Sequence, residues 1–107
     1  MQVINISGTL VSDSEKCKDR NGRSFSRFTV TCGSNDINGR TVFTHYRCIC
    51  YVGGYDALKK GDQVFVSGRF SPSVSLNNEG REVITSLNVM VHQITGGYRA
   101  VERKDKR

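Results

Sequence analysis

Hydrophobic and polar side chains alternate along most of this chain with a period of two. In the first ten residues, Ile4, Ile6 and Leu10 fall on one side of an extended chain. Polar residues such as Asn5 and Ser7 fall on the other side. This alternation is typical of a β-strand with one buried face. The same pattern, with frequent β-branched residues, predicts five strands: 3–10, 27–32, 41–51, 63–70 and 82–94.

Segments rich in glycine and asparagine separate the predicted strands. These residues tolerate the positive φ that tight turns require, so we expect hairpin tips at three segments: DRNGR (19–23), SNDINGR (34–40) and NNEGR (77–81). One helical candidate is the segment GYDALKKG (54–61), in which Asp56 could open one or two turns and Gly61 could close them.

Five strands with a short helix between the third and the fourth form the element order of an OB barrel. This all-β, five-stranded Greek-key fold commonly binds oligonucleotides. Other small barrels are alternatives. Gly8 and Gly68 lie in strands that otherwise alternate cleanly, as expected where barrel strands bend sharply. We therefore predict one OB-fold nucleic-acid-binding domain over residues 1–97 and a short, flexible basic tail over 98–107.

Positive charge is concentrated in two parts of the chain. The 107 residues include 16 Lys and Arg against 10 Asp and Glu, a formal net charge of +6. Seven basic residues lie within 16–47, and five lie within the last nine residues. A basic domain of this size favours a polyanionic partner, through counterion release if that partner is nucleic acid. The alternative is a solvated surface that only keeps the protein soluble.

The segment THYRCICY (44–51) mixes His, Arg, Tyr and Cys, and strand parity sorts these side chains into two faces. Cys48 and Cys50 share the inward side with Tyr46, so we predict reduced, buried thiols. Being two residues apart on one strand, they are badly placed for a disulfide, and they lack the C-x-x-C spacing of a structural zinc site. We predict no metal, no cofactor and a cytoplasmic protein.

Several segments resemble the bacterial single-stranded DNA-binding protein family, which has an OB fold. In chain order the similar segments are INISGTLVSDSE, NGRSFSRFTVTC, THYRCICY, LKKGDQVFVSGRF and NNEGREVITSLNVMVHQI, which span about residues 3–94. The most specific part is the third strand followed by Leu-Lys-Lys-Gly and an alternating strand. The resemblance implies sequence-tolerant binding of single-stranded DNA, serving replication, recombination or mobile-element transfer.

Three features depart from the family pattern. The chain has no tryptophan, and His45, Asp36 and Ser75 stand where the family places tryptophans on its DNA-facing surface. The helical segment is shorter than usual. The family's long tail with an acidic tip, which recruits replication proteins, does not follow RKDKR (103–107). We therefore do not expect recruitment through such a tail.

The outward side of the third predicted strand carries the chemistry of single-strand binding. Tyr51 offers a ring on which a base can stack, Arg47 offers a cation, and His45 is a weaker platform than an indole. The resemblance places Arg47 and Tyr51 at family positions that contact DNA. The alternative for Tyr51 is a rim aromatic that shields the core. Further candidate contacts, each also compatible with a solvated surface charge, are Arg27, Lys59, Lys60, Arg69, Arg81, Lys16, Lys18 and Arg20.

The resemblance also implies self-assembly, as a homodimer or homotetramer in which first strands pair between subunits. The uncovered start of the first strand favours this arrangement. The predicted interface residues are Val3, Ile4, Asn5, Ile6 and Tyr46. For Tyr46, ordinary core packing is the alternative.

Other functions stay open. One is a primosome-type OB protein that binds single strands and a helicase-loading partner. Another is a nuclease, because Asp13, Glu15 and Asp19 could hold a divalent cation near one turn. Their spacing fits no established ligand loop, so we predict that the protein is not an enzyme. A third is an assembly module that binds no oligonucleotide. RNA is an alternative ligand. No window approaches the roughly 18 apolar residues of a membrane helix, so we predict a soluble protein.

Overall fold

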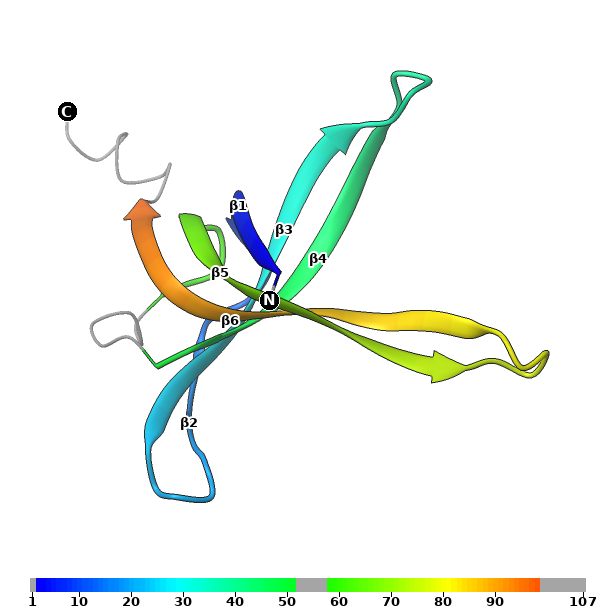
Figure 1. Ribbon diagram of the computed structural model, residues 1–107. Helices are drawn as coiled ribbons and strands as arrows, with labels where there is room; N and C mark the ends of the chain where they lie inside the picture. Colours follow the sequence, from blue (N-terminus) through cyan, green and yellow to red (C-terminus); the bar gives the residue numbers. More distant parts are fainter. Residues whose placement is uncertain (1, 52–57, 99–107) are drawn as a thin grey trace, which may run out of the picture.

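The structure is a computed structural model that describes residues 2–51 and 58–98 (Figure 1). The described part is built from strands and contains no helix. The strands are β1 (Val3–Leu10), β2 (Glu15–Lys18), β3 (Ser24–Asn35), β4 (Thr41–Cys50), β5 (Gln63–Leu76) and β6 (Glu82–Tyr98). The all-β prediction is therefore confirmed, and each of the five predicted strands is present.

Five of these strands form a mixed barrel. The sheet order is β1-β5-β6-β4-β3, and β1 closes the barrel by pairing with β3 as well as β5. Strands β4 and β6 are parallel, whereas the other neighbours are antiparallel. The extra strand β2 pairs with the outer edge of β3. This small barrel is consistent with the predicted OB fold.

Two glycines allow the barrel to close. At Gly8, an added Cβ would collide with the carbonyl oxygen of Thr31 and lie 2.8 Å from a methyl of Val30. At Gly68, it would collide with the backbone of Met90, beside an irregularity in the β5–β6 pairing. Such contacts leave no room for a side chain, so the expected role of these two glycines is confirmed.

The barrel interior is filled by alternate residues of every barrel strand. Cys48 and Cys50 are buried, at 0 % and 1 % exposure, and Tyr46 packs against the same core. The parity analysis of β4 is thereby confirmed. Burial raises the pKa of the Cys48 thiol to about 12, so this cysteine stays protonated. The other buried core side chains are Ile6, Leu10, Phe28, Val30, Leu58, Val64, Val66, Val89, Val91 and Ile94.

The predicted helix (54–61) lies largely outside the described residues, which resume at Leu58. From there to Gly61 the chain has no helix and makes a turn, in which Gly61 has a φ of +90°. Leu58 is buried, and the backbone N–H of Lys59 donates to the buried carboxylate of Asp62. Most of the predicted tail (98–107) also lies outside the described residues. Within those residues, no helix is long and apolar enough to cross a membrane.

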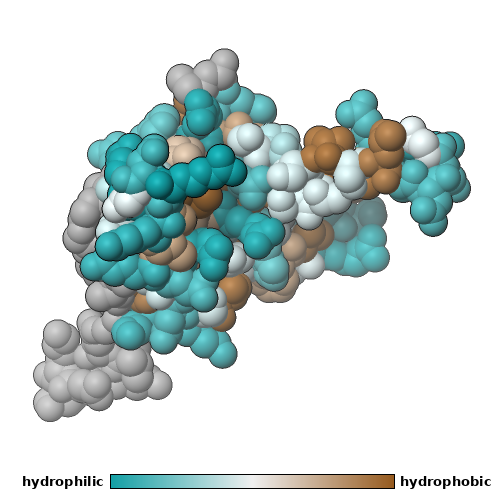
Figure 2. Space-filling model, turned by 90° about the horizontal axis from the view of Figure 1, so that it is seen from below, coloured by the Kyte–Doolittle hydropathy of each residue, from teal (hydrophilic) through white to brown (hydrophobic). Residues whose placement is uncertain are grey.

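Three hairpins, β2–β3, β3–β4 and β5–β6, project from the barrel in different directions (Figure 1). We call them arms. Figure 2 shows hydrophobic side chains on the protruding β5–β6 arm, where Val74, Leu76, Val83 and Ile84 are exposed. Each arm ends in the predicted turn, and the three turns share one design. In the first, the Asp19 side chain accepts the backbone N–H groups of Asn21 and Arg23.

Asp36 and Asn77 hold the other two turns in the same way. In each turn a glycine with a φ near +80° follows, and then an arginine: Gly22 and Arg23, Gly39 and Arg40, Gly80 and Arg81. This geometry is a type I turn followed by a left-handed residue, which only glycine adopts without strain. The three predicted hairpin tips are confirmed.

Candidate nucleic-acid interface

One outward surface of the barrel runs along β3 and β4. Cross-strand pairs on this surface include Thr31 with His45, Thr29 with Arg47, and Arg27 with Ile49. His45, Arg47 and Arg27 are exposed, and Ile49 is half-buried. We call this surface the β3–β4 face, and its members are Phe25, Arg27, Thr29, Thr31, Gly33, Phe43, His45, Arg47, Ile49 and Tyr51.

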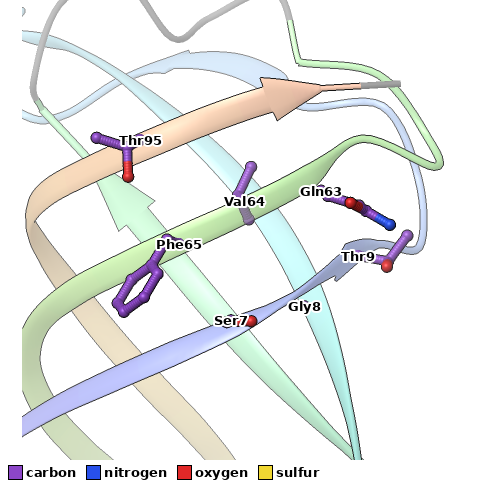
Figure 3. A pocket seen from close by; sticks show the side chains of 7 residues that line it. All are labelled: Ser7, Gly8, Thr9, Gln63, Val64, Phe65 and Thr95. Carbon is purple, nitrogen blue, oxygen red and sulfur yellow. The ribbon is translucent and has the colours of Figure 1, made fainter. Parts of the chain in front are cut away.

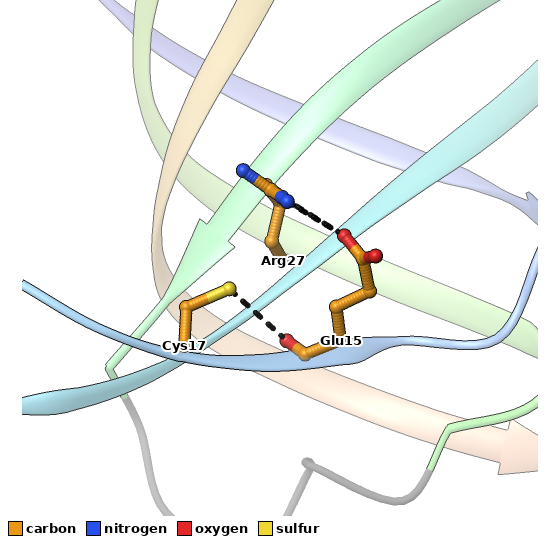
Figure 4. Close-up of polar contacts among 3 residues, drawn as sticks. All are labelled: Glu15, Cys17 and Arg27. Atoms are coloured by element: carbon orange, nitrogen blue, oxygen red, sulfur yellow. Dashed lines mark hydrogen bonds and ion pairs between the residues drawn. The ribbon is translucent and has the colours of Figure 1, made fainter.

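Arg27 and Arg47, each predicted as a DNA contact, lie near one another on this face. They line a hollow of about 230 Å³, whose wall also includes Glu15 from β2. The Arg27 guanidinium donates to Glu15, with the Nη2 nitrogen 2.7 Å from the Oε1 oxygen (Figure 4). This hydrogen bond raises the pKa of Arg27 above its ordinary value, so the guanidinium remains charged. The Glu15 partner fixes the direction in which Arg27 points.

Tyr51 lies at the end of the β3–β4 face that adjoins the β2–β3 arm. Its hydroxyl donates to Asp19 over 3.0 Å, and its ring is 5.2 Å from that of Phe25. The Arg23 guanidinium lies over the Tyr51 ring, 4.6 Å from the centroid, in a cation–π contact. Tyr51 therefore anchors the tip of the β2–β3 arm to β4, and one side of its ring is covered.

The contacts at this end shift two pKa values. The backbone N–H of Arg23 lowers the pKa of Asp19, and the hydroxyl of Tyr51 adds to this effect. The hydrogen bond to Asp19 raises the pKa of Tyr51. Near neutral pH the pair is therefore a carboxylate that accepts a hydrogen bond from a neutral phenol.

Phe43 lies at the opposite end of the β3–β4 face and was missed by the sequence analysis. It is 66 % exposed and pairs across the strands with Gly33. The signal that could have identified it is parity, because residues 43, 45, 47, 49 and 51 point to the same side of one strand.

The surface continues from β4 onto β6 and β5. Arg47 is in register with Asn88, and Ile49 is in register with Met90. Met90 in turn is paired with Arg69, which the sequence analysis had proposed as a contact. The Asn88 amide donates to the Ser71 carbonyl at 2.9 Å. Arg69 thus lies in the same register row as Arg27, with Ile49 and Met90 between them.

The other predicted contacts are more widely distributed. The backbone N–H of Lys60 donates to Asp13, and the Lys59 ammonium lies 4.0 Å from the same carboxylate. These two lysines lie just before β5. Lys16, Lys18 and Arg20 belong to the β2–β3 arm and are exposed, whereas Arg81 is at the tip of the separate β5–β6 arm. The predicted set is therefore one cluster around Arg27 and Arg47 with outlying charges.

The predicted interface residues of β1 fall into two groups. Val3 and Asn5 point outward and are exposed, while Ile4 and Ile6 contribute to the core. Along one edge, β1 pairs with β5 from Val3 to Thr9, but along the other edge it pairs with β3 only at Thr9 and Leu10. The second edge is thus unpaired over residues 3–6 within the described chain. The Tyr46 ring packs edge-on against Phe70, with 6.5 Å between centroids.

The three carboxylates considered for a metal site have separate partners. Asp13 accepts from Lys60, Glu15 accepts from Arg27, and Asp19 accepts from its own turn and from Tyr51. Over residues 2–51 and 58–98, no three His, Cys, Asp or Glu side chains lie close enough to hold a metal ion.

A second outward surface, on β1, β5 and β6, has a different character. Ser7, Phe65 and Thr95 project from these three strands around a hollow of about 440 Å³ (Figure 3). Phe65 is 54 % exposed. We call this surface the neutral face, and its residues, none of them charged, are Asn5, Ser7, Thr9, Gln63, Phe65, Ser67, Gln93 and Thr95.

The chain was compared with protein-family models and with curated proteins. A scan against models of protein families finds no match to the chain, and a search of curated proteins finds no significant relative.

Proposed function

We propose that this barrel is an OB fold and that the protein binds single-stranded DNA with little sequence preference, as a non-catalytic cytoplasmic protein. The observation that carries the proposal is the row of outward side chains on β4. Phe43, His45, Arg47 and Ile49 occupy successive outward positions on β4, and Tyr51 follows directly after the end of this strand. Such a row combines rings, a cation and apolar contact area along a single direction, as an extended polynucleotide requires.

The chemistry of the row favours unpaired bases over a duplex. Every base has a flat face that can stack on an aromatic ring, and these faces are inaccessible inside a base-paired helix. The Arg23 guanidinium, supported by Tyr51, presents a second kind of planar surface on which a base can lie. Because stacking reads no base edge, this surface would tolerate any sequence.

Arginine side chains supply the contacts to the phosphates of the bound strand. Arg27 on β3 and Arg47 on β4 are diagonal neighbours across the strand pair and line one hollow, and Arg69 continues the charge onto β5. Guanidinium groups form strong paired hydrogen bonds with phosphate oxygens. A sugar-phosphate chain following the row would therefore meet positive charge on both of its sides.

Self-association is part of the proposal. The unpaired edge of β1 over residues 3–6 can accept a strand from a second copy, because an exposed strand edge is a template for pairing. Val3 and Asn5 would then lie close to their counterparts. Both a dimer and a tetramer can be built on such pairing.

The test is fluorescence anisotropy with a labelled single strand of mixed sequence and with a duplex of equal length, across a series of salt concentrations. We expect tighter binding of the single strand, and a linear fall of the logarithm of affinity with the logarithm of salt concentration. Comparable binding of strand and duplex at every salt concentration would reduce the face to a general basic patch. Lack of binding at low salt would refute the proposed function.

A further inference from the structure

The exposed ring of Phe43 occupies an unusual setting. On the β3–β4 arm its cross-strand partner is Gly33, which has no side chain to stand beside it. A Cβ built on Gly33 would lie 3.1 Å from the Cε1 atom of Phe43 and 3.4 Å from its Cδ1 atom. The ring therefore leans over the bare backbone of Gly33. Phe43 is 66 % exposed to solvent.

This setting differs from that of the other aromatic residues on the same face. The Tyr51 ring is covered by Arg23 and touches Phe25, and its hydroxyl is held by Asp19. Phe25 is half-buried. A base approaching that end must first meet or displace the arginine, whereas a base approaching Phe43 meets the ring itself.

We propose that Phe43, seated on Gly33, is an open stacking platform for an unpaired nucleobase at the outer end of the β3–β4 face. The inference rests on the proposed function. It adds a binding site for one base, which lies farther out on the β3–β4 arm than His45. Phe43 lies on β4 and Tyr51 follows directly after it, and their separation of eight residues corresponds to about 27 Å of extended chain. The bound strand would therefore run from the barrel out along the arm, with the Arg27 and Arg47 cluster between the two aromatic ends.

The backbone of Gly33 lies beside the ring of Phe43, and the rest of the ring is open to solvent. A purely structural role is the competing explanation, since an aromatic residue placed opposite a glycine also stabilises a hairpin. Exposure alone does not separate the two, so the test must report on stacking.

The absence of tryptophan from the chain makes such a test direct. In Phe43→Trp the new indole is the only one in the protein, and a base stacking on it quenches its fluorescence. Phe65→Trp is the matched control, because Phe65 is similarly exposed but lies on the neutral face. We expect single-stranded DNA to quench Phe43→Trp strongly and to leave Phe65→Trp unchanged.

The complementary measurement is affinity. Phe43→Leu keeps an apolar cover over Gly33 but removes the flat ring, so we expect binding to weaken about 5- to 100-fold, with an unchanged salt slope. Phe65→Leu should bind like the parent. Circular dichroism, thermal unfolding and light scattering on each variant show that fold and assembly are retained. If Phe43→Leu does not fold, the quenching of Phe43→Trp still decides.

The outcomes separate this inference from the proposed function. If the parent binds single strands while Phe43→Leu binds equally well and Phe43→Trp is not quenched, Phe43 only covers Gly33 and the platform is refuted. If the parent binds no single strand, the proposed function fails first and the platform fails with it. Quenching confined to Phe43→Trp, with weaker binding of Phe43→Leu, supports both.

Discussion

The β3–β4 face and the neutral face are two outward surfaces of the same barrel, and each exposes one phenylalanine prominently. The β3–β4 face carries Phe43 at one end, and His45, Arg47 and Arg27 follow toward the other end. Around Phe65, the neutral face carries only hydroxyl and amide side chains. In a chain with a net charge of +6, a surface without charged residues is as informative as a basic one.

The difference is one of local charge, because many other lysines and arginines lie on the arms and just before β5. A solvated shell would place lysines and arginines on both surfaces. Protein–protein contacts are depleted in charge at their centres, and like-charged copies repel where their charges meet. We therefore expect protein contact at the neutral face and contact with a polyanion at the β3–β4 face. Each prediction below tests this division.

The largest expected effect comes from removing the paired cations. In the double variant Arg27→Ala and Arg47→Ala, each lost phosphate contact should cost about tenfold or more in affinity for single-stranded DNA at low salt. The slope of log affinity against log salt should fall by roughly 1 to 2, since two contacts are lost. Anisotropy titrations across a salt series measure both quantities.

The matched control for this variant is Gln63→Ala with Gln93→Ala, which shortens two exposed side chains on the neutral face. This control should bind like the parent. Equal weakening by the two double variants would abolish the distinction between the faces. An unchanged slope in the arginine variant would mean that Arg27 and Arg47 do not meet phosphates.

A smaller loss of affinity is expected at Tyr51. Two variants separate the role of its ring from the role of its hydroxyl. Tyr51→Ala removes the ring beneath Arg23 and the anchor of the β2–β3 arm, so affinity should fall about tenfold or less. Tyr51→Phe keeps the ring and loses only the hydrogen bond to Asp19. It should bind like the parent and lower the melting temperature by a few degrees. Anisotropy measures the affinity of each variant, and calorimetry measures its melting temperature.

Weaker binding by Tyr51→Phe, with unchanged stability, would show that the hydroxyl itself touches the strand. Full binding by a folded Tyr51→Ala would assign the ring to the barrel rim, which was the alternative drawn from the sequence. In that case binding of single-stranded DNA by the β3–β4 face would depend on its arginines and on Phe43.

Parity along single strands was the most reliable guide from sequence to structure. It placed Cys48 and Cys50 in the core and Arg47 on the surface, because side-chain direction in a strand depends only on position. The turn residues were equally predictable, since each tip needs a glycine with positive φ. Strand β2 was missed because its four residues, Glu15–Lys18, are too few to show alternation.

Features that depend on pairing between distant strands could not be predicted from local sequence patterns. The register of Arg47 with Asn88 joins residues about 40 positions apart in a parallel pair, and no local pattern encodes it. The hydrogen bond from Tyr51 to Asp19 depends on how the β2–β3 arm folds back onto β4. Tyr51 was therefore expected to be an open ring, although Arg23 covers part of it.

The smallest expected effect is on the pH dependence of stability at the β2–β3 arm, whose tip is held by Asp19. The pKa of Asp19 is lowered in the folded protein, so its contribution to stability is present above its ordinary pKa of 3.8 and is lost as acid protonates it. Asp19→Asn should preserve the turn, as Asn77 does in the β5–β6 arm, and lose less stability between pH 7 and pH 3. Urea unfolding at both pH values measures the difference, and Asn77→Asp, which puts a carboxylate in the third turn, should show the reverse trend. If the parent and Asp19→Asn lose the same free energy of unfolding between pH 7 and pH 3, Asp19 does not contribute to the acid sensitivity of the β2–β3 arm.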